Sequence, residues 1–418
     1  MTRSLPCMVL ALLAAGCVDV EPKGTSWPLD DPNADERPVG YVDPVATPTP
    51  VEQTPNPDDG LSTCMSVDAV DRIEDVGWGA AFFATNSGVI FHRRAEDYNL
   101  EVHAWSYGAE SEVAAPGWAL GAQGSRVLVA TYEGVELIDR NSGSVFQHQD
   151  SMWELWPEPS GESRKALDGD LAAWQGGGGK WLSLGADAPR RLADAAYRAP
   201  YVADGMAVWV DRDPSSYAQH VYGWKDGQTE RLTATGSEAT MPVTSAGRVF
   251  WLGERGAVWM WDSGQSEKLH DGPCGPVATD RGEAVFACAD EGYGGTYAYA
   301  GARHLYHFDG ARLRLVHEAE GDIFGPRLQT GVIAWAEFED FGQMSPGTVY
   351  IQRAADGTTV EVGPMSSGCI ACCGPDQAVA TLEFVDSTLA WTQSVSDEDP
   401  WNVGIAVAYI GRRCPGGS

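Results

Sequence analysis

Acidic and aromatic residues gather in three short segments that we take as candidate binding sites. The candidate residues are Asp290, Glu291 and Tyr293; then Glu337, Glu339, Asp340 and Phe341; and finally Asp397, Glu398, Asp399 and Trp401. Carboxylates beside aromatic rings suit a cationic ligand, such as a basic protein or polymer, or a carbohydrate. Calcium is an alternative ligand, although no Asp-x-Asp-x-Asp-Gly loop occurs. The plain alternative is a solvated acidic surface that binds nothing.

Signals for catalysis are weak in this sequence. It has no Gly-x-Ser-x-Gly, His-Glu-x-x-His or P-loop motif. His304 and His307 are three residues apart on an expected strand, so their side chains point to opposite faces and a shared metal is not expected. We expect no catalytic residue and no cofactor other than a calcium ion. The rival hypothesis is a hydrolase or lyase in which Glu337, Glu339 or Asp340 acts with Asp399 as acid and base.

The charge balance argues against nucleic acid as a ligand. The 418 residues include 28 Lys and Arg against 59 Asp and Glu, which gives a net charge of −31. No run of Lys and Arg is longer than two, so the chain offers no basic stripe to a phosphate backbone.

One pattern, a Gly- or Asp-containing turn followed by a short apolar strand, recurs eight times. Its aligned ends are 35 to 56 residues apart, which is typical of four-stranded propeller blades. The eight stretches are TNSGVIFH (85–92), GAQGSRVLVA (121–130), LDGDLAAW (167–174), ADGMAVW (203–209), SAGRVFW (245–251), DRGEAVFA (280–287), QTGVIAW (329–335) and VDSTLAW (385–391). The sequence therefore predicts an all-β propeller of eight four-stranded blades. Seven blades are the alternative, if the unit around Val127–Thr131 is irregular.

The last unit lacks a fourth strand, because only GIAVAYI (404–410) follows VDSTLAW. The segment CMSVDAV (64–70) has alternating apolar residues and no blade of its own. We expect it to supply the missing strand and to close the ring, which removes an exposed sheet edge.

The repeat resembles the Tol-like propeller repeats of periplasmic proteins. The nearest match is ADGMAVWVDRDPSSYAQHVYGWKDGQTERLTA (203–234), in which a strand pair around a DG turn ends in an aromatic residue and the fourth strand reads RLT. The resemblance covers residues 64 to 411 and implies the fold alone.

Propeller topology brings the candidate residues together. The loops between the second and third strands of all blades emerge on one face, here called the top face. Units six, seven and eight carry the acidic and aromatic segments, unit one adds Glu96, Asp97 and Tyr98, and units two, three and five have tight loops. We therefore expect a raised acidic and aromatic wall on one side of the top face, where an envelope protein, basic polymer or carbohydrate could bind.

Cysteines test this topology. Cys64 and Cys414 should meet at the bottom face and form a disulfide that locks the ring, and Cys274 and Cys288 should pair across the hairpin centred on Arg281. The loop SSGCIACCGP holds Cys369, Cys372 and Cys373; we expect a local disulfide there, with a metal or a reactive thiol as alternatives.

The N-terminus predicts export and a lipid anchor. Residues 1–17 have Arg3, a short apolar stretch and the ending LLAAGC, which resembles the lipobox of bacterial lipoproteins and marks Cys17 for lipidation. Residues 18–61 are rich in Pro, Asp and Glu and are expected to form a flexible tether, followed by the propeller domain over 62–414. Val18 after the cysteine favours the outer membrane of a bacterial cell envelope. An ordinary secretion signal is the alternative.

Overall fold

The computed structural model describes residues 65–411 except 68–69, 75, 77–81, 95–99, 107, 115–116, 132–133, 149–164, 177, 186, 195–198, 214–216, 234–237, 291–300, 340–345, 367–380 and 395–402. Contacts divide the chain into two units, Met1–Asn56 and Pro57–Ser418, and every described residue belongs to the second. Within the described residues, no helix has the length and apolar character needed to span a membrane.

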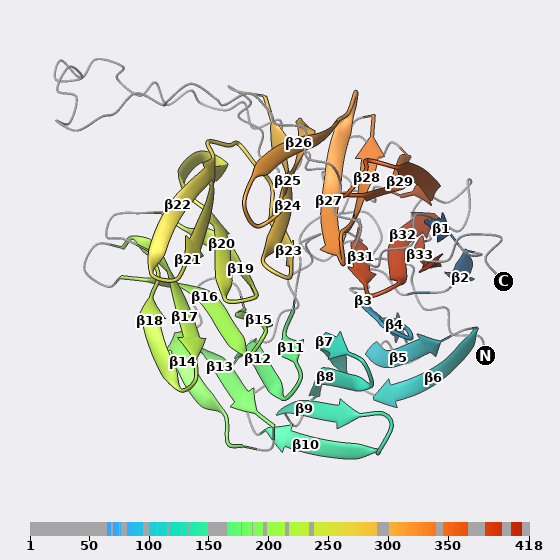
Figure 1. The fold of residues 1–418 in the computed structure, drawn as a ribbon. Helices are drawn as coiled ribbons and strands as arrows, with labels where there is room; N and C mark the ends of the chain where they lie inside the picture. Colours follow the sequence, from blue (N-terminus) through green and yellow to red (C-terminus); the bar gives the residue numbers. More distant parts are fainter. Residues whose placement is uncertain are drawn as a thin grey trace, which may run out of the picture. The chain divides into compact units, whose positions relative to one another are not determined.

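The second unit is a β-propeller of eight blades, as the repeat predicted (Figure 1). Each of the first four blades is an antiparallel sheet of four consecutive strands. They are β3 (Phe83–Thr85), β4 (Gly88–Arg94), β5 (Leu100–Ser106) and β6 (Ala109–Ala114); β7 (Trp118–Gln123), β8 (Arg126–Thr131), β9 (Gly134–Asp139) and β10 (Ser144–His148); β11 (Leu167–Asp168), β12 (Leu171–Gly176), β13 (Gly179–Leu184) and β14 (Arg190–Asp194); and β15 (Tyr201–Ala203), β16 (Met206–Arg212), β17 (Gln219–Lys225) and β18 (Gln228–Arg231).

The next three blades repeat this plan, and the eighth modifies it. The strands are β19 (Thr240–Ser245), β20 (Arg248–Leu252), β21 (Val258–Asp262) and β22 (Gln265–His270); β23 (Ala278–Asp280), β24 (Glu283–Ala289), β25 (Ala302–Phe308) and β26 (Leu313–Glu318); β27 (Asp322–Gln329), β28 (Val332–Phe338), β29 (Gly347–Arg353) and β30 (Thr359–Met365); and β31 (Leu382–Val385), β32 (Thr388–Ser394) and β33 (Val403–Gly411). A 3-10 helix, Glu254–Gly256, joins β20 to β21. The unit around Val127 forms a regular blade, so the seven-blade alternative is wrong.

The N-terminal segment completes the eighth blade, as expected. Strands β1 (Ser66–Val67) and β2 (Asp71–Ile73) both pair antiparallel with β33, which is the third strand of that blade. The innermost strands contact one another all around the ring, including β31 of the last blade with β3 of the first. The eighth blade therefore joins the two ends of the described chain in one sheet.

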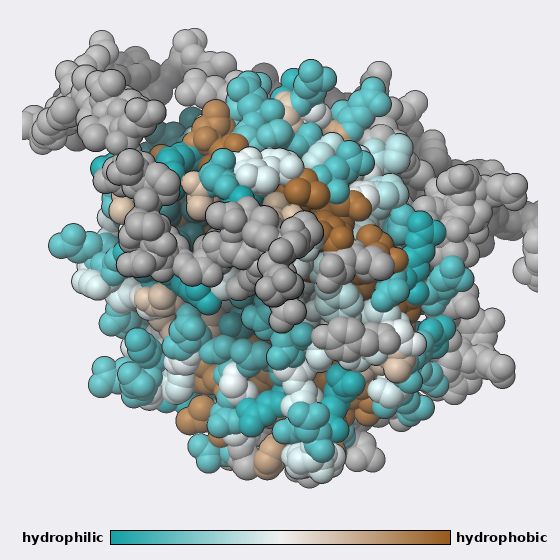
Figure 2. Space-filling view, turned by 45° about the vertical axis from the view of Figure 1, so that its right-hand side comes forward, coloured by the Kyte–Doolittle hydropathy of each residue, from teal (hydrophilic) through white to brown (hydrophobic). Residues whose placement is uncertain are grey.

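Large apolar side chains fill the space between the blades. The repeated Trp residues occupy one blade position and are at most 3% exposed, which confirms that they form core. These residues are Trp174, Trp209, Trp251, Trp335 and Trp391. In the view of Figure 2 the described surface is mostly hydrophilic, and hydrophobic residues form small separate patches.

The hairpin turns between first and second strands have the backbone twist that tight hairpins require. In the fourth blade φ is 51° at Asp204 and 72° at Gly205, so both central residues are left-handed, as in a type I′ turn. Ala246, Arg281 and Thr330 take the first turn position in the next three blades with φ between 47° and 51°. Glycine follows each of them, so the second position carries no strain.

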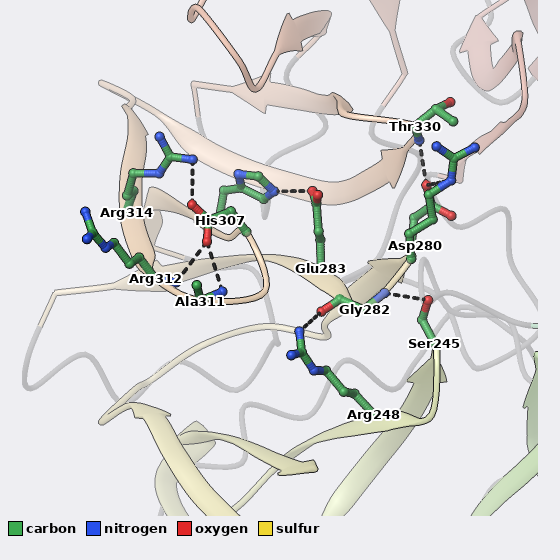
Figure 3. A network of polar contacts seen from close by, with 12 residues as sticks. Ser245, Arg248, Asp280, Gly282, Glu283, His307, Ala311, Arg312, Arg314 and Thr330 are labelled. Carbon is green, nitrogen blue, oxygen red and sulfur yellow. Dashed lines mark hydrogen bonds and ion pairs between the residues drawn. The ribbon is translucent and has the colours of Figure 1, made fainter. Parts of the chain in front are cut away.

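Side chains at these turns tie the fourth, fifth, sixth and seventh blades to one another. Asp204 Oδ2 accepts a hydrogen bond of 2.6 Å from the backbone N–H of Ala246 in the following blade, and Asp280 Oδ2 accepts one of 2.6 Å from Thr330. Ser245 Oγ accepts a bond of 3.1 Å from the N–H of Gly282. Figure 3 shows the last two of these contacts and a further one between the fifth and sixth blades, in which Arg248 Nη1 donates to the carbonyl oxygen of Gly282 at 2.9 Å. Polar groups on the bottom face thus hold the ring together.

Candidate functional site

Three of the candidate binding residues lie within the described part of the chain. Asp290 follows β24, Glu337 lies in β28, and Glu339 follows β28, so all three stand at the top ends of second strands. The others lie outside the described residues: Glu291, Tyr293, Asp340, Phe341, Asp397, Glu398, Asp399 and Trp401, together with Glu96, Asp97 and Tyr98. The wall as a whole stays a prediction.

Asp290 is held by a histidine on the neighbouring strand of the same blade. Its Oδ1 lies 2.7 Å from Nε2 of His304, and the carboxyl side chain is 71% exposed. His307, three residues further along β25, contacts Glu283 Oε2 at 2.9 Å through Nε2. The two histidines therefore face different partners, as their spacing on one strand predicted.

Glu337 connects the sixth and seventh blades. Its Oε1 lies 2.7 Å from Nε2 of His317 on β26 and accepts a hydrogen bond of 2.8 Å from the indole of Trp335. Burial alone would raise the pKa of Glu337, but the His317 and Trp335 contacts outweigh burial and lower the pKa. Glu337 is thus an ionised carboxylate held in place, whereas Glu339 is exposed.

A groove of about 640 Å³ opens at the top of the fifth blade, beside the connection from the fourth. Three acids line it: Glu238 in that connection, Glu254 in the loop between β20 and β21, and Asp271 after β22. Glu254 is 75% and Asp271 is 83% exposed at the side chain. The groove therefore presents carboxylates to the solvent on the top face.

The wall of the groove combines an aromatic row with a basic side chain. Trp251, Trp259 and Lys268 are cross-strand neighbours on β20, β21 and β22. The two indole rings stack with centroids 6.4 Å apart and planes 8° apart. Lys268 Nζ lies 5.6 Å from the centroid of Trp259 and 2.5 Å from Asp271 Oδ1. The groove thus already places one cation between an aromatic ring and a carboxylate.

Sequence reasoning missed this groove because it assigned the fifth unit a tight loop. The loop is indeed short, but Arg255 takes a left-handed conformation with φ of 58°, and its side chain is 89% exposed beside Glu254. The signal available in the sequence was Trp251 and Trp259 on successive strands, with Lys268 one strand later. The groove also includes Glu238, and the order of residues along the chain does not show that Glu238 and Asp271 line the same groove.

The sulfurs of Cys274 and Cys288 lie 2.10 Å apart, at disulfide distance, where the pairing was expected. Cys274 lies between β22 and β23, and Cys288 lies near the end of β24. His270 Nδ1 lies 3.5 Å from Cys274 Sγ and 3.7 Å from Cys288 Sγ. The pair Cys64 and Cys414 and the three cysteines near residue 370 lie outside the described residues.

The chain is similar to solved propeller structures at low identity. It shares 11% identity and a TM-score of 0.47 with BamB from Moraxella catarrhalis, over 83% of this chain and 100% of that one. The β-propeller domain of the Trilobed protease from Pyrococcus furiosus shares 12% identity and a TM-score of 0.42, over 68% of this chain and 98% of that one. A puromycin-hydrolyzing peptidase from Mycobacterium tuberculosis shares 13% identity and a TM-score of 0.43, over 77% of this chain and 59% of that one.

No protein-family model and no curated protein matches the chain, so the relation to Tol-like repeats stays a prediction. The fold and the site geometry together define the class of this protein as an eight-bladed β-propeller. Because the similarities above are all low, its function has to be argued from its own residues.

Proposed function

We propose that this chain is a lipid-anchored protein of the bacterial cell envelope, placed at the outer membrane, whose propeller binds a basic partner through acidic side chains on its top face. The lipobox-like ending at Cys17 and the Pro-rich acidic stretch 18–61 support the anchor and the tether. The observation that carries the binding role is the groove lined by Glu238, Glu254 and Asp271.

The groove suits an arginine or lysine side chain of a partner. Lys268 shows the arrangement that a cation adopts there, with its ammonium near both the Trp259 ring and the Asp271 carboxylate. Glu238 and Glu254 line the same groove and offer two further carboxylates. A net charge of −31 would attract a basic protein or polymer from a distance and would speed its encounter with this face.

A binding role is favoured over hydrolysis. The rival enzyme needs a general acid, which is a carboxyl whose pKa is raised. Glu337 has a lowered pKa and is occupied by His317 and Trp335, so it suits a fixed contact better than proton transfer. The hydrolase or lyase alternative now rests on Glu339, which is exposed, and on Asp340 and Asp399, which lie outside the described residues.

The test is calorimetric titration of the full chain with a ten-residue lysine peptide. The groove variant carries Glu238→Gln, Glu254→Gln and Asp271→Asn. The control variant carries Glu230→Gln, Glu267→Gln and Asp187→Asn, which remove the same charge at exposed sites that do not line the groove.

We expect the groove variant to bind at least tenfold more weakly than the native chain and the control variant to bind within threefold of it. Equal losses of affinity in the two variants, or no binding by the native chain, would contradict the proposal that the groove binds a basic partner. Capture from envelope extracts with the same three proteins would then identify the natural partner.

A further inference from the structure

A second cavity, of about 1020 Å³, lies on the opposite face, where the central channel opens between the turns that join first and second strands. Residues from all eight blades line it. Its volume is at the upper end of the range for small-molecule sites. Because it opens on the bottom face, it is independent of the groove described above.

Tyr201 and a buried ion pair lie on the wall of this cavity. The hydroxyl of Tyr201 from the fourth blade is hydrogen-bonded to Thr279 of the sixth, and burial raises the pKa of Tyr201. Arg327 and Glu383, from the seventh and eighth blades, act on the same tyrosine through their charges. Arg327 is 5% exposed, and its Nη2 lies 3.3 Å from Glu383 Oε1. Side chains from the fourth, sixth, seventh and eighth blades therefore lie near one another here and give the cavity a polar floor.

Two carboxylates that line the cavity are occupied by the bonds that tie the blades together. Asp204 and Asp280 each accept a backbone N–H of the following blade at 2.6 Å. Asp168, which lies beside the cavity, accepts bonds from Gly205 N–H at 3.2 Å and from Gln123 at 3.0 Å. These acids therefore have a structural role that accounts for their presence.

Two of the four cations that line the cavity also join neighbouring blades: Arg126 donates to the carbonyl oxygen of Gly169, and Arg327 pairs with Glu383. Lys165 and Arg281 instead contact acids of their own blades. Lysine and arginine are scarce in this chain, where acids outnumber them 59 to 28, yet four acids and four cations line the cavity. Lys165 contacts Asp168 at 3.1 Å, and its ammonium has two more N–H donors. Arg281 is 72% exposed, and its Nε lies 4.0 Å from Asp280. Arg126 lines the cavity from the second blade and contacts Asp170.

Lys165 of the third blade and Arg281 of the sixth line the same cavity. The charge of Lys165, on the third blade, acts on the carboxyl of Asp280, on the sixth. Asp280 is adjacent to Arg281 in the sequence. Cations from the third and sixth blades, Lys165 and Arg281, therefore line the same cavity. Donors on two sides of a cavity suit a ligand that carries oxyanion groups.

We propose that this cavity binds a small organic anion that carries carboxylate or phosphate groups, with Lys165 and Arg281 as its main contacts. Arg126 adds a third cation at the rim, and Tyr201 closes the floor. The neutral backbone of such a ligand would lie against Ala84, Ala122 and Phe384, which also line the cavity.

The experiment is calorimetric titration of the full chain with citrate and with glucose 6-phosphate, and with glucose as the uncharged control. The test variant carries Lys165→Gln and Arg281→Gln. The matched control carries Lys225→Gln and Arg303→Gln, two cations that do not line the cavity. A Lys165→Arg variant keeps the positive charge. If it binds like the native chain, the loss of affinity in the test variant comes from the lost charge and not from local misfolding.

We expect at least one of the two anions to bind, glucose to bind at least tenfold more weakly, and the test variant to lose affinity at least tenfold. The control pair and Lys165→Arg should stay within threefold of the native chain. Citrate binding alone would assign carboxylate ligands, and glucose 6-phosphate binding alone would assign phosphate ligands. No binding of either anion, equal binding of glucose, or equal loss in the control pair would overturn the proposal. The lysine-peptide titration tests the groove on the top face, whereas these titrations test the cavity on the bottom face. The proposed function and this inference can therefore fail separately.

Discussion

Asp280 of the sixth blade accepts a hydrogen bond of 2.6 Å from the backbone N–H of Thr330 in the seventh, and this bond spans the seam between two sheets. The same kind of contact joins Asp204 to Ala246. Strand pairing stabilises each blade internally but does not cross the seams. Polar ties of this kind therefore set how neighbouring blades align along the channel.

Removing the Asp280 acceptor should weaken the ring. We expect Asp280→Ala to lower the free energy of unfolding by about 1 to 2 kcal/mol, because the Thr330 N–H loses its partner. Asp280→Asn keeps an acceptor and should cost less than half of that. Urea denaturation at neutral pH measures both, and equal losses would argue against the hydrogen bond as the cause.

The same residue predicts a pH dependence. Burial raises the pKa of Asp280 in the folded chain, and the Thr330 bond offsets this only in part. A raised folded-state pKa gives stability that is present at low pH and is lost as the pH rises through that pKa. Asn cannot ionise, so the stability of Asp280→Asn relative to that of the native chain should increase as the pH rises from about 3 to about 7. A constant difference across this window would contradict the assignment.

The stability contribution of Glu337 should depend on pH in the opposite direction. Its pKa is lowered, so its ionised form stabilises the fold above the unfolded-state pKa, and the contribution is lost as the pH falls through the folded-state pKa. Glu337→Gln should lower the free energy of unfolding by about 1 kcal/mol at neutral pH and by less below about pH 4. His317→Ala tests the same contact, and the double variant should lose less than the sum of the two single losses.

Ring closure can be tested at Ile73. This side chain is 3% exposed and pairs with Ile405 on β33. We expect Ile73→Ala to lower the free energy of unfolding by about 3 kcal/mol, because it leaves a cavity in the closing sheet. Val70, which is 39% exposed, provides the control, and its change to Ala should have little effect. Thermal unfolding that separates the two variants by several degrees would support the closure.

The cysteines predict a thiol count. Without reductant, Cys274 and Cys288 should resist labelling, and so should Cys64 and Cys414 if the ring is locked at its ends. Labelling of all four would contradict both pairings. Replacing Cys274 and Cys288 by Ser should lower the free energy of unfolding by about 3 kcal/mol, since the bond closes a short loop of sequence separation 14.

The lipid anchor predicts a modification at one residue. Expressed in a bacterial host, the chain should lose residues 1–16 and carry a diacylglyceryl group on Cys17, and it should fractionate with membranes. Cys17→Ser should release the same propeller in soluble form. Mass spectrometry of the N-terminal peptide distinguishes a lipidated cysteine from an ordinary cleaved secretion signal.

The sequence by itself determined the blades. Trp209 and its counterparts recur at one position in five of the eight blades, where they pack as buried core. The tight turn of the fourth blade depends on two adjacent residues, Asp204 and Gly205. Such signals are local and repeat, so each copy reinforces the others. The closing strand could be predicted as well. The last unit lacks a fourth strand, and the segment 64–70 has the alternating apolar residues of a strand but no blade of its own.

Only the tertiary structure decided where binding sites form. Glu238 and Asp271 line one groove, and Lys165 of the third blade and Asp280 of the sixth line one cavity. The sequence marked Glu337 as a candidate binding residue, and only the structure shows that His317 of the sixth blade contacts it. These neighbours are far apart along the chain, and their meeting depends on the angle at which successive blades pack. That angle comes from the sum of many side-chain contacts, which no single motif records.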